Sequence, residues 1–463
     1  MVSKLDFVSK MKENIIFIII DSMNARKFFG NENVSLTPNF DYLIKNGSYF
    51  EKAYSSADST LLAITSIFTG KHPFKTGIRS NKFNKLSEDV KTCFDVLKKN
   101  SYNFYAFKPT VTKTIGLLPK FENNDCDYYY HFDLHDGLGD KIIDLLEGNK
   151  MKQPWIFYTH LHDLHFPISV AENFNDEKFG FSNYERQVSA IDYWIGKIIK
   201  KIDFENTILV ITSDHGVFIP AVRTKDHQIN FEVNAKKQML TSTLTNKIPN
   251  FLKPFKSKMF YLMEDKQQNK LKKFVEKLNL KPHEKRGLLW RRGDLNKYLF
   301  DENVHVPLLM VGNKIEKNKI VSKQVRAMDI FPTIFQIINI QENDDLDGES
   351  LVPYIQGKEY EDKIAYFEST PSLQKMTNEV IGLSTSKYKY FRDRITPKKR
   401  VHLFDLQNDP YEDHNIADEN PKIIEEMENL LSTIRNEKTI KVDEYSEEET
   451  KAIEEELKKL GYD

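Results

Sequence analysis

The most constraining feature of this sequence is a series of short apolar, β-branched runs separated by longer segments with helical spacing. The runs have the length and content of buried strands, and they cover Asn14–Ile20, Asn103–Lys108, Trp155–His160, Thr207–Asp214 and Val306–Gly312. Strands that alternate with helices form parallel sheets with helices on both faces. The pattern therefore predicts an α/β fold with a mostly parallel central sheet.

The segments between the runs carry the signals that begin and end helices. Thr37 suits an N-cap, Pro38 the first helical position, and Gly47 the residue just past the C-terminus. Residues Asn183–Ile202 have the spacing of an amphipathic helix that leads into the strand ending at Asp214.

The pattern changes after about residue 360, where shorter extended pieces replace the long alternation. KIAYFEST, EVIGLSTSKYKYF and VHLFDL predict a small antiparallel sheet beside the main one. Two charged helices are expected to follow, over Pro421–Asn436 and Ser446–Leu460. We therefore expect a catalytic domain over residues 1–360 and a C-terminal subdomain over residues 361–463.

Composition limits the partners and the location. The formal net charge is −1 over 463 residues, which gives no overall attraction for nucleic acid, and we expect no nucleic-acid partner. The apolar run Ile15–Ile20 is too short to span a bilayer, and the residues before it lack the features of a secretory signal. We expect a cytoplasmic enzyme.

Residues 222–292 form a locally basic insertion, with 18 Lys and Arg against 6 Asp and Glu. One interpretation is a solvated helical excursion. The other is a lid or anchor that contacts an anionic substrate or, peripherally, an anionic membrane surface.

Ionisable side chains follow two of the predicted strands directly. Asp21 ends the first strand, and Asp214 ends the strand that precedes His215. In an open α/β sheet the carboxyl ends of the strands form the active site, so these three side chains predict a divalent-metal site. The alternative for each one alone is an N-cap aspartate or an ordinary loop histidine.

Thr60 is the candidate nucleophile. It begins a short predicted helix that stops at Gly70, where unpaired backbone amides and the helix dipole stabilise an alkoxide or an oxyanion. A metal held beside it by Asp21, Asp214 and His215 would lower the pKa of the hydroxyl. The same position is also compatible with a simple capping role.

A resemblance makes this interpretation more specific. The ordered segments IIFIIIDSMNA, TPNFDYLIKNGSYFEKAYS, STLLAITSIFTGKHPFKTGI, ITSDHG, FDENVHVPLLMVG and HLFDLQNDPYEDHNIAD closely resemble the sulfatase family of the alkaline phosphatase superfamily. The resemblance covers nearly the whole chain except the basic insertion. It implies an alkaline-phosphatase-like three-layer αβα sandwich with a small C-terminal antiparallel sheet.

The resemblance assigns the family's metal ligands and nucleophile to positions in this chain. The metal-binding aspartate falls on Asp21, and the Asp-His pair falls on Asp214 and His215, while Ser22 replaces an aspartate found in many members and leaves the site leaner. The nucleophile falls on Thr60. Typical sulfatases have cysteine or serine there, which is oxidised to formylglycine, and threonine cannot be converted in this way. Threonine at this position resembles a subset of sulfatase-like proteins and also the phosphoethanolamine and phosphoglycerol transferases, which use a metal-bound threonine alkoxide.

Histidines complete the predicted site. His165, before Phe-Pro in WIFYTHLHDLHFP, resembles a family histidine that approaches the ester oxygens and would act as general acid and substrate-binding group. His160 and His162 alternate along a strand onto one face, where we expect a structural role for one or both. His227 follows the Asp214–His215 pair at a spacing similar to a substrate-binding histidine of threonine-type relatives.

These residues predict a metal-dependent hydrolase that cleaves a sulfate or phosphate ester through Thr60. The expected cofactor is one divalent ion, calcium or manganese first and magnesium or zinc as alternatives, without formylglycine. The expected substrate is an anionic ester of a glycan, a lipid or a small molecule. Two alternatives stay open, namely a phospho-head-group transferase acting on a glycan or lipid, and a catalytically degenerate binding protein.

Overall fold

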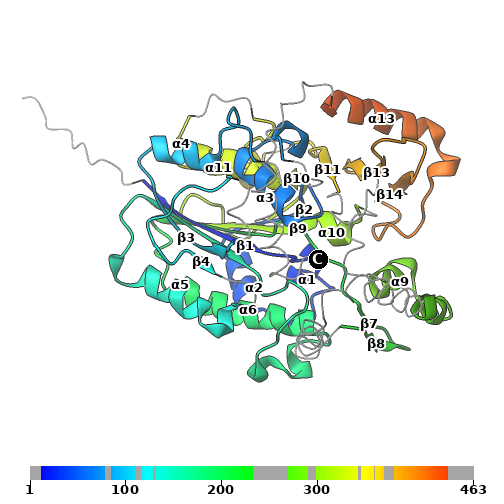
Figure 1. Ribbon diagram of the computed structural model, residues 1–463, viewed down its shortest axis with the longest axis horizontal. Helices are drawn as coiled ribbons and strands as arrows, with labels where there is room; N and C mark the ends of the chain where they lie inside the picture. The colour runs from blue at the N-terminus through cyan, green and yellow to red at the C-terminus, as the bar shows by residue number, and fades with distance from the viewer. Residues whose placement is uncertain are drawn as a thin grey trace, which may run out of the picture.

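A central sheet of eight strands organises the chain, as the computed structural model shows (Figure 1). The structure describes residues 12–78, 85–110, 116–128, 132–232, 269–289, 299–341, 346–358, 360–369 and 380–435. The strand order is β10-β2-β9-β6-β1-β5-β3-β4. The strands are β1 (Asn14–Ile20), β2 (Ser48–Tyr54), β3 (Asn103–Pro109), β4 (Asp127–Tyr128), β5 (Trp155–Leu161), β6 (Thr207–Thr212), β9 (His305–Val311) and β10 (Lys319–Arg326).

The predicted strands form the middle of this sheet. The strands β6, β1, β5 and β3 are parallel neighbours, and every residue of β1, β5 and β6 is buried. One direction differs from the prediction, because β9 runs antiparallel to both β6 and β2. β2 and β10 were not predicted. β2 and β10 expose several residues, and their mixed polar and apolar content lacks the continuous apolar run of a central strand.

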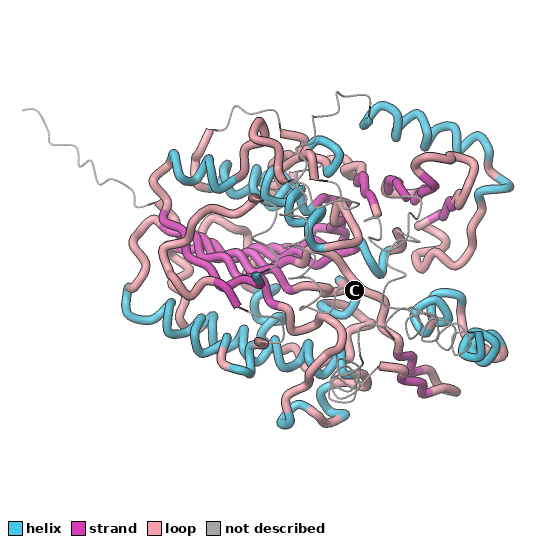
Figure 2. Tube along the Cα trace, in the orientation of Figure 1, coloured by secondary structure: helices cyan, strands magenta, loops and turns pink. Residues whose placement is uncertain are grey.

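Helices cover both faces of the sheet and confirm the three-layer arrangement (Figure 1, Figure 2). On one face lie α3 (Thr60–Thr69), α4 (Cys93–Lys99) and α11 (Ile330–Ile337), which share an apolar core with side chains of β1 such as Phe17. On the other face lie α2 (Pro38–Lys45), α5 (Leu138–Leu146) and α6 (Asn183–Ile199). The structure confirms the predicted helices α2 and α6, although Thr37 makes no side-chain cap bond.

The C-terminal part forms the predicted small antiparallel sheet. Its strands are β11 (Ala365–Glu368), β12 (Val380–Ser384), β13 (Tyr388–Asp393) and β14 (His402–Asp405), and α13 (Pro421–Arg435) packs on it. A bridge between Ala57 and Glu368 links this sheet to the loop before α3. The second expected C-terminal helix, Ser446–Leu460, lies outside the described residues.

Only parts of the basic insertion are described. β7 (Ala221–Arg223) and β8 (Gln228–Asn230) form a hairpin, and α9 (Pro282–Leu288) packs on it through an apolar cluster that includes Val222, Val275 and Leu288. Residues 233–268 and 290–298, which carry much of the positive charge, lie outside the described part. Among the described residues, none of the helices is long and apolar enough to cross a membrane.

Candidate active site

The candidate site lies where β6, β1 and β5 end, at their carboxyl ends. The register pairs Ile19 with both His160 and Thr212, so these three side chains occupy one row on one face of the sheet. Side chains alternate along a strand, so residues two positions further on point to the same face. Asp21, His162 and Asp214 occupy these positions after Ile19, His160 and Thr212. The helix α3 covers this face, which explains why Thr60 at its N-terminus meets the strand ends.

Asp21 is held by the turn that follows β1. Its Oδ1 accepts a 2.6 Å hydrogen bond from the hydroxyl of Ser22, whose backbone adopts a left-handed conformation at φ 62°. A non-glycine residue in this conformation costs about 1 to 3 kcal/mol and persists where the surroundings enforce it, often at functional sites. The Ser22 amide donates to Asp214 Oδ1 at 3.3 Å. The strained turn therefore ties the two aspartates together.

Asp214 presents one oxygen to its neighbours and one to the site. Oδ1 accepts the backbone N–H of His215 at 2.9 Å, whereas Oδ2 is buried and has no hydrogen bond. An oxygen of this kind costs stability unless a cation or a proton compensates it. Asp214 Oδ2 is therefore the atom that most directly indicates a bound cation.

The tautomer of His215 follows from its neighbours. Nδ1 lies 2.7 Å from the carbonyl oxygen of Gly216, which can only accept, so Nδ1 carries the hydrogen and the neutral ring presents the lone pair of Nε2 to the site. Burial alone would lower the pKa of His215, but the charges of Asp214 and Asp21 raise it. Metal-binding histidines are oriented in this way by a partner on the other nitrogen.

Thr60 is the first residue of α3, which ends at Gly70 with φ 62°, as predicted. Its Oγ1 lies 3.4 Å from Asp21 Oδ2 and 3.4 Å from His215 Nε2. The side chain is partly exposed, whereas Asp21 and Asp214 are buried. The hydroxyl thus sits at the open side of the cluster, where a substrate can reach it.

His160 and His162 also belong to the cluster. Alternation along the strand placed them on one face, and the structure brings both rings to Asp21, while their structural role stays a prediction. The Nε2 atoms of both rings lie 3.4 Å from Asp21 Oδ2, and His160 Nε2 lies 3.9 Å from Asp214 Oδ2. The signal that could have identified them was a His-x-His pair at the end of the strand that pairs with the one leading to Asp21. The two rings add nitrogen donors beside Asp21.

The donor atoms form a ring whose dimensions match those of a cation site. In order, Asp21 Oδ2, His160 Nε2, Asp214 Oδ2, His215 Nε2 and Thr60 Oγ1 are separated by 3.4, 3.9, 3.6, 3.4 and 3.4 Å. Atoms bound to one cation at about 2.0 to 2.2 Å lie about 3 to 4 Å from their neighbours. The residues present therefore fit a divalent cation.

The charge of Asp21 agrees with this arrangement. Burial alone would raise the pKa of its carboxyl, but the hydrogen bond with His160 and the charges of His162, His165 and His215 hold it well below its usual range. The carboxylate is therefore ionised among imidazoles. An ionised carboxylate in this position can bind a divalent cation.

His165 lies at the edge of the cluster. Its ring stacks on His162 with centroids 5.6 Å apart, and Nδ1 donates to the carbonyl oxygen of Phe166 at 3.1 Å. Nε2 is therefore the nitrogen that can exchange a proton with a ligand. The charge of His165 also helps to hold the pKa of Asp21 low, which agrees with a ring near the cluster.

His227 is not brought to this cluster. It lies in the turn between β7 and β8, where its backbone bonds with Thr224, and within the described residues no contact joins it to the strand ends. Its predicted role in substrate binding therefore stays a prediction.

The short helix α10 (Asp301–Val304) supports the site from the side of the C-terminal sheet. The carbonyl of Asn303 accepts the Gly216 amide at 2.7 Å, and that of Glu302 accepts Asn24 from the turn after Asp21. A Cβ on Gly216 would lie 2.2 Å from the Glu302 carbonyl oxygen, so only glycine fits there.

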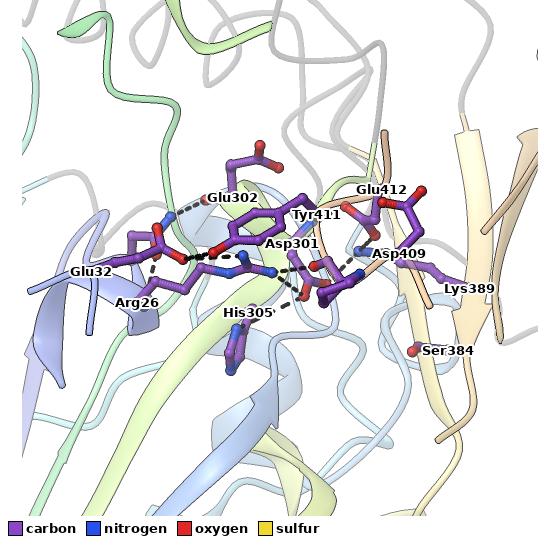
Figure 3. Close-up of polar contacts among 12 residues, drawn as sticks. Arg26, Glu32, Asp301, Glu302, His305, Ser384, Lys389, Asp409, Tyr411 and Glu412 are labelled. Carbon is purple, nitrogen blue, oxygen red and sulfur yellow. Dashed lines mark hydrogen bonds and ion pairs between the residues drawn. The ribbon is translucent and has the colours of Figure 1, made fainter. Parts of the chain in front are cut away.

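Buried ion pairs anchor α10 in turn. Asp301 Oδ1 lies 2.8 Å from Nζ of the fully buried Lys389 of β13, whose second partner is Glu412 Oε1 at 2.7 Å. Asp301 Oδ2 lies 3.5 Å from Arg26, which also contacts the ring of Tyr411 (Figure 3). This network connects the small sheet to both turns that carry the aspartates.

Comparison with known proteins agrees with the fold. The sequence model of the family described as Sulfatase matches residues 13–340, and a second, described as N-sulphoglucosamine sulphohydrolase, C-terminal, matches residues 294–437. Arylsulfatase K from Gallus gallus is 22% identical over 471 residues, which cover 92% of this chain and 83% of that protein.

Solved structures share the fold. Ps i-CgsB in complex with k-i-k-neocarrahexaose superposes with a TM-score of 0.62 at 16% identity, covering 97% of this chain and 99% of that one. Phosphonate monoester hydrolase of Agrobacterium radiobacter gives a TM-score of 0.63 at 15% identity, covering 92% and 96%.

The fold and the family match place the chain among the sulfuric ester hydrolases of the alkaline-phosphatase-like class. The chain belongs to the sulfatase family.

Proposed function

We propose that this protein is a metal-dependent ester hydrolase whose nucleophile is the hydroxyl of Thr60. The observation that carries the proposal is the position of Thr60 Oγ1, 3.4 Å from both Asp21 Oδ2 and His215 Nε2, at the N-terminus of α3. A divalent cation bound there would lower the pKa of the hydroxyl and neutralise charge on the ester's non-bridging oxygens. Asp21, Asp214 and His215 are the residues that would hold it.

The side chains of this chain can carry a two-step displacement. The Thr60 hydroxyl first loses its proton to solvent. Its oxygen then attacks the sulfur or phosphorus, the bond to the ester oxygen breaks, and His165 Nε2 gives its proton to the leaving oxygen. In the second step His165 takes a proton from water, and that water releases the group from Thr60. The backbone amides at the start of α3 stabilise negative charge on the group being transferred.

The family and the nucleophile favour different esters as the substrate. Family membership favours a sulfate ester, whereas a threonine that cannot become formylglycine favours phosphate chemistry, as in the threonine-type transferases it resembles. Ps i-CgsB was solved with a neocarrahexaose, an oligosaccharide, which supports a glycan as the organic part. We propose an anionic glycan ester, with lipid and small-molecule esters as the other classes to test.

Activity of the full chain would be measured on aryl sulfates, phosphate monoesters and phosphodiesters, each with zinc, manganese, calcium and magnesium. Cleavage of one class that depends on a divalent ion supports the proposal. Thr60→Ala should lower kcat by several orders of magnitude, because the nucleophile acts as a unit with the cation. Thr60→Ser, which keeps a hydroxyl, is the matched control and should retain most of the rate.

Two results would contradict this function. Near-normal turnover in Thr60→Ala would exclude the threonine as nucleophile. A wild-type protein that binds no divalent ion and cleaves none of the esters would favour the degenerate binding protein. Transfer is distinguished from hydrolysis by adding a sugar or glycerol acceptor and measuring whether product shifts from the free anion to the acceptor ester.

The role of His165 has its own test. His165→Asn should slow esters with poor leaving groups, such as alkyl esters, far more than nitrophenyl esters, which leave without a proton. An equal loss on both kinds of ester would mean that His165 binds substrate without donating the proton.

A further inference from the structure

A buried tyrosine of α6 contacts the turn that carries Asp21. The hydroxyl of Tyr184 donates a 2.8 Å hydrogen bond to the carbonyl of Ser22 and accepts one of 2.8 Å from the amide of Asn24. The same oxygen lies 3.8 Å from the sulfur of Met23. One hydroxyl therefore contacts three consecutive residues of the turn and makes both of its short hydrogen bonds to backbone groups.

These bonds act on the part of the turn that sets the two aspartates. Ser22 has the left-handed backbone at φ 62°, and it donates to Asp214 through its amide and to Asp21 through its hydroxyl. A residue in this conformation persists where its surroundings enforce it. Ser22 and Asn24 are both buried, so their backbone groups require partners, and Tyr184 supplies one to each. The tyrosine therefore helps to enforce the conformation that ties the aspartates together.

A carboxylate from the basic insertion fixes Tyr184 in turn. Tyr184 is the second residue of α6, and the side chain of Glu232 accepts its amide at 2.9 Å and the amide of Asn183 at 2.6 Å. A carboxylate in this position satisfies unpaired amides and is stabilised by the helix dipole. Glu232 directly follows the hairpin of β7 and β8. The insertion therefore bonds to the same helical turn that presents the Tyr184 hydroxyl to the site.

We infer that Tyr184 is a positioning residue, whose hydroxyl holds the turn after β1 so that Asp21 and Asp214 keep the spacing of a cation site. Glu232 holds the tyrosine in place. The inference rests on the proposed function, in which the two aspartates bind a cation. Among the described residues, the Tyr184 hydroxyl bonds to the turn and to none of the donor atoms, so it acts on the site through Ser22 and its neighbours. The insertion thereby supports the site without having to contact the substrate.

Tyr184→Phe tests the inference on the full chain. The variant keeps the ring and leaves the Ser22 carbonyl and the Asn24 amide without their partner. Loss of a group that orients metal ligands typically lowers metal affinity about 10- to 100-fold, and we expect a loss of that size for zinc. Zinc affinity would be measured by competition with a chromophoric chelator, which requires no ester to be cleaved.

The matched control is Tyr354→Phe on α12 (Val352–Ile355). It removes another hydroxyl from a buried tyrosine, one that donates at 2.8 Å to the carbonyl of Glu361, and it should bind zinc like the wild type. The visible absorption of bound Co²⁺ reports the geometry of its ligands, so the spectrum should change in Tyr184→Phe and stay the same in the control. A role in stability alone would lower the free energy of unfolding and leave both the zinc affinity and the Co²⁺ spectrum of the folded protein unchanged.

Glu232→Gln is a second variant, and it decides the test if Tyr184→Phe does not fold. Glutamine keeps the shape, but its amide nitrogen cannot accept a helix N–H, so zinc binding should weaken, by less than in Tyr184→Phe. Its control is Glu284→Gln, which alters a carboxylate that accepts the amide of Lys281 at 2.7 Å at the start of α9 and should leave zinc affinity unchanged. Wild-type zinc affinity in folded Tyr184→Phe would overturn the inference. Wild-type affinity in Glu232→Gln would overturn the link to the insertion.

The outcomes separate this inference from the proposed function. Excess zinc should restore ester cleavage in Tyr184→Phe and not in Thr60→Ala, because the tyrosine sets the affinity for the cation whereas the threonine is the nucleophile. Weaker zinc binding in Tyr184→Phe, with no ester cleaved by the wild type, would keep the positioning role and overturn the function. Cleavage that depends on Thr60, with unchanged zinc affinity in Tyr184→Phe, would do the reverse. A wild-type chain that binds neither zinc nor Co²⁺ would overturn both.

Discussion

Lys389→Met should destabilise the protein strongly, because Lys389 is the only cation that contacts both Asp301 and Glu412 within the described residues. Its side chain is fully buried and lies 2.8 Å and 2.7 Å from the two carboxylates. Removing one partner of a buried ion pair costs about 3 to 5 kcal/mol, because the remaining charge is left uncompensated. Methionine keeps most of the volume, so the loss reports charge rather than a cavity.

The pH at which the loss is measured adds a second test. Burial raises the pKa of Glu412 to about 7, even though Lys389 opposes the shift. Above that pH both carboxylates are ionised and repel each other without the lysine, whereas below it Glu412 takes up a proton. The loss in Lys389→Met should therefore be larger at pH 8 than at pH 6.

Urea unfolding followed by circular dichroism at both pH values measures these free energies. The double variant Lys389→Met with Glu412→Gln removes the stranded charge and should recover about 1 to 3 kcal/mol at pH 8. A loss below about 1 kcal/mol, or an equal loss at both pH values, would show that the network does not stabilise the fold as argued.

The other predictions concern the support of the site and the pH dependence of the fold. Tyr158→Phe should weaken zinc binding about 10- to 100-fold in a calorimetric titration, whereas Tyr102→Phe, which loses one hydrogen bond far from the site, should not change it. Gly216→Ala should weaken zinc binding and cost about 1 to 3 kcal/mol in urea unfolding, because its Cβ would lie 2.2 Å from a backbone oxygen. Gly287→Ala, whose Cβ would lie 3.1 Å from a backbone oxygen, should cost less. Glu412 holds a proton in the folded state between its unfolded pKa of 4.5 and its folded pKa of about 7. Its contribution to stability should therefore fall by about 3 kcal/mol as pH rises through that window, and Glu412→Gln should remove this part of the slope. An unchanged slope in that variant would assign the pH dependence to other groups.

The central strands could be predicted from the sequence because each one is marked by its own continuous apolar run. Continuous apolar runs such as Ile15–Ile20 can only be buried, and the aspartate after each run therefore reaches the same edge of the sheet. The direction of β9 could not be predicted, because an apolar run has the same composition whether it pairs parallel or antiparallel.

The site was only partly predictable for a similar reason. Asp21, Thr60, Asp214 and His215 follow from their places at the ends of elements, and the structure brings them together. His160 and His162 needed the register between β1 and β5, which sets them beside Asp21 and which no single segment encodes. His227 was placed from spacing alone, and spacing does not determine where a hairpin lies. The cytoplasmic location and the membrane contact of the basic insertion stay predictions.

The most direct test of the account is anomalous diffraction from crystals of the zinc-loaded protein. The account predicts a zinc peak about 2.0 to 2.2 Å from Thr60 Oγ1 and from ligand atoms of Asp21, Asp214 and His215. A zinc ion bound elsewhere, or a Thr60 hydroxyl turned away from an ion held by the other three, would contradict it.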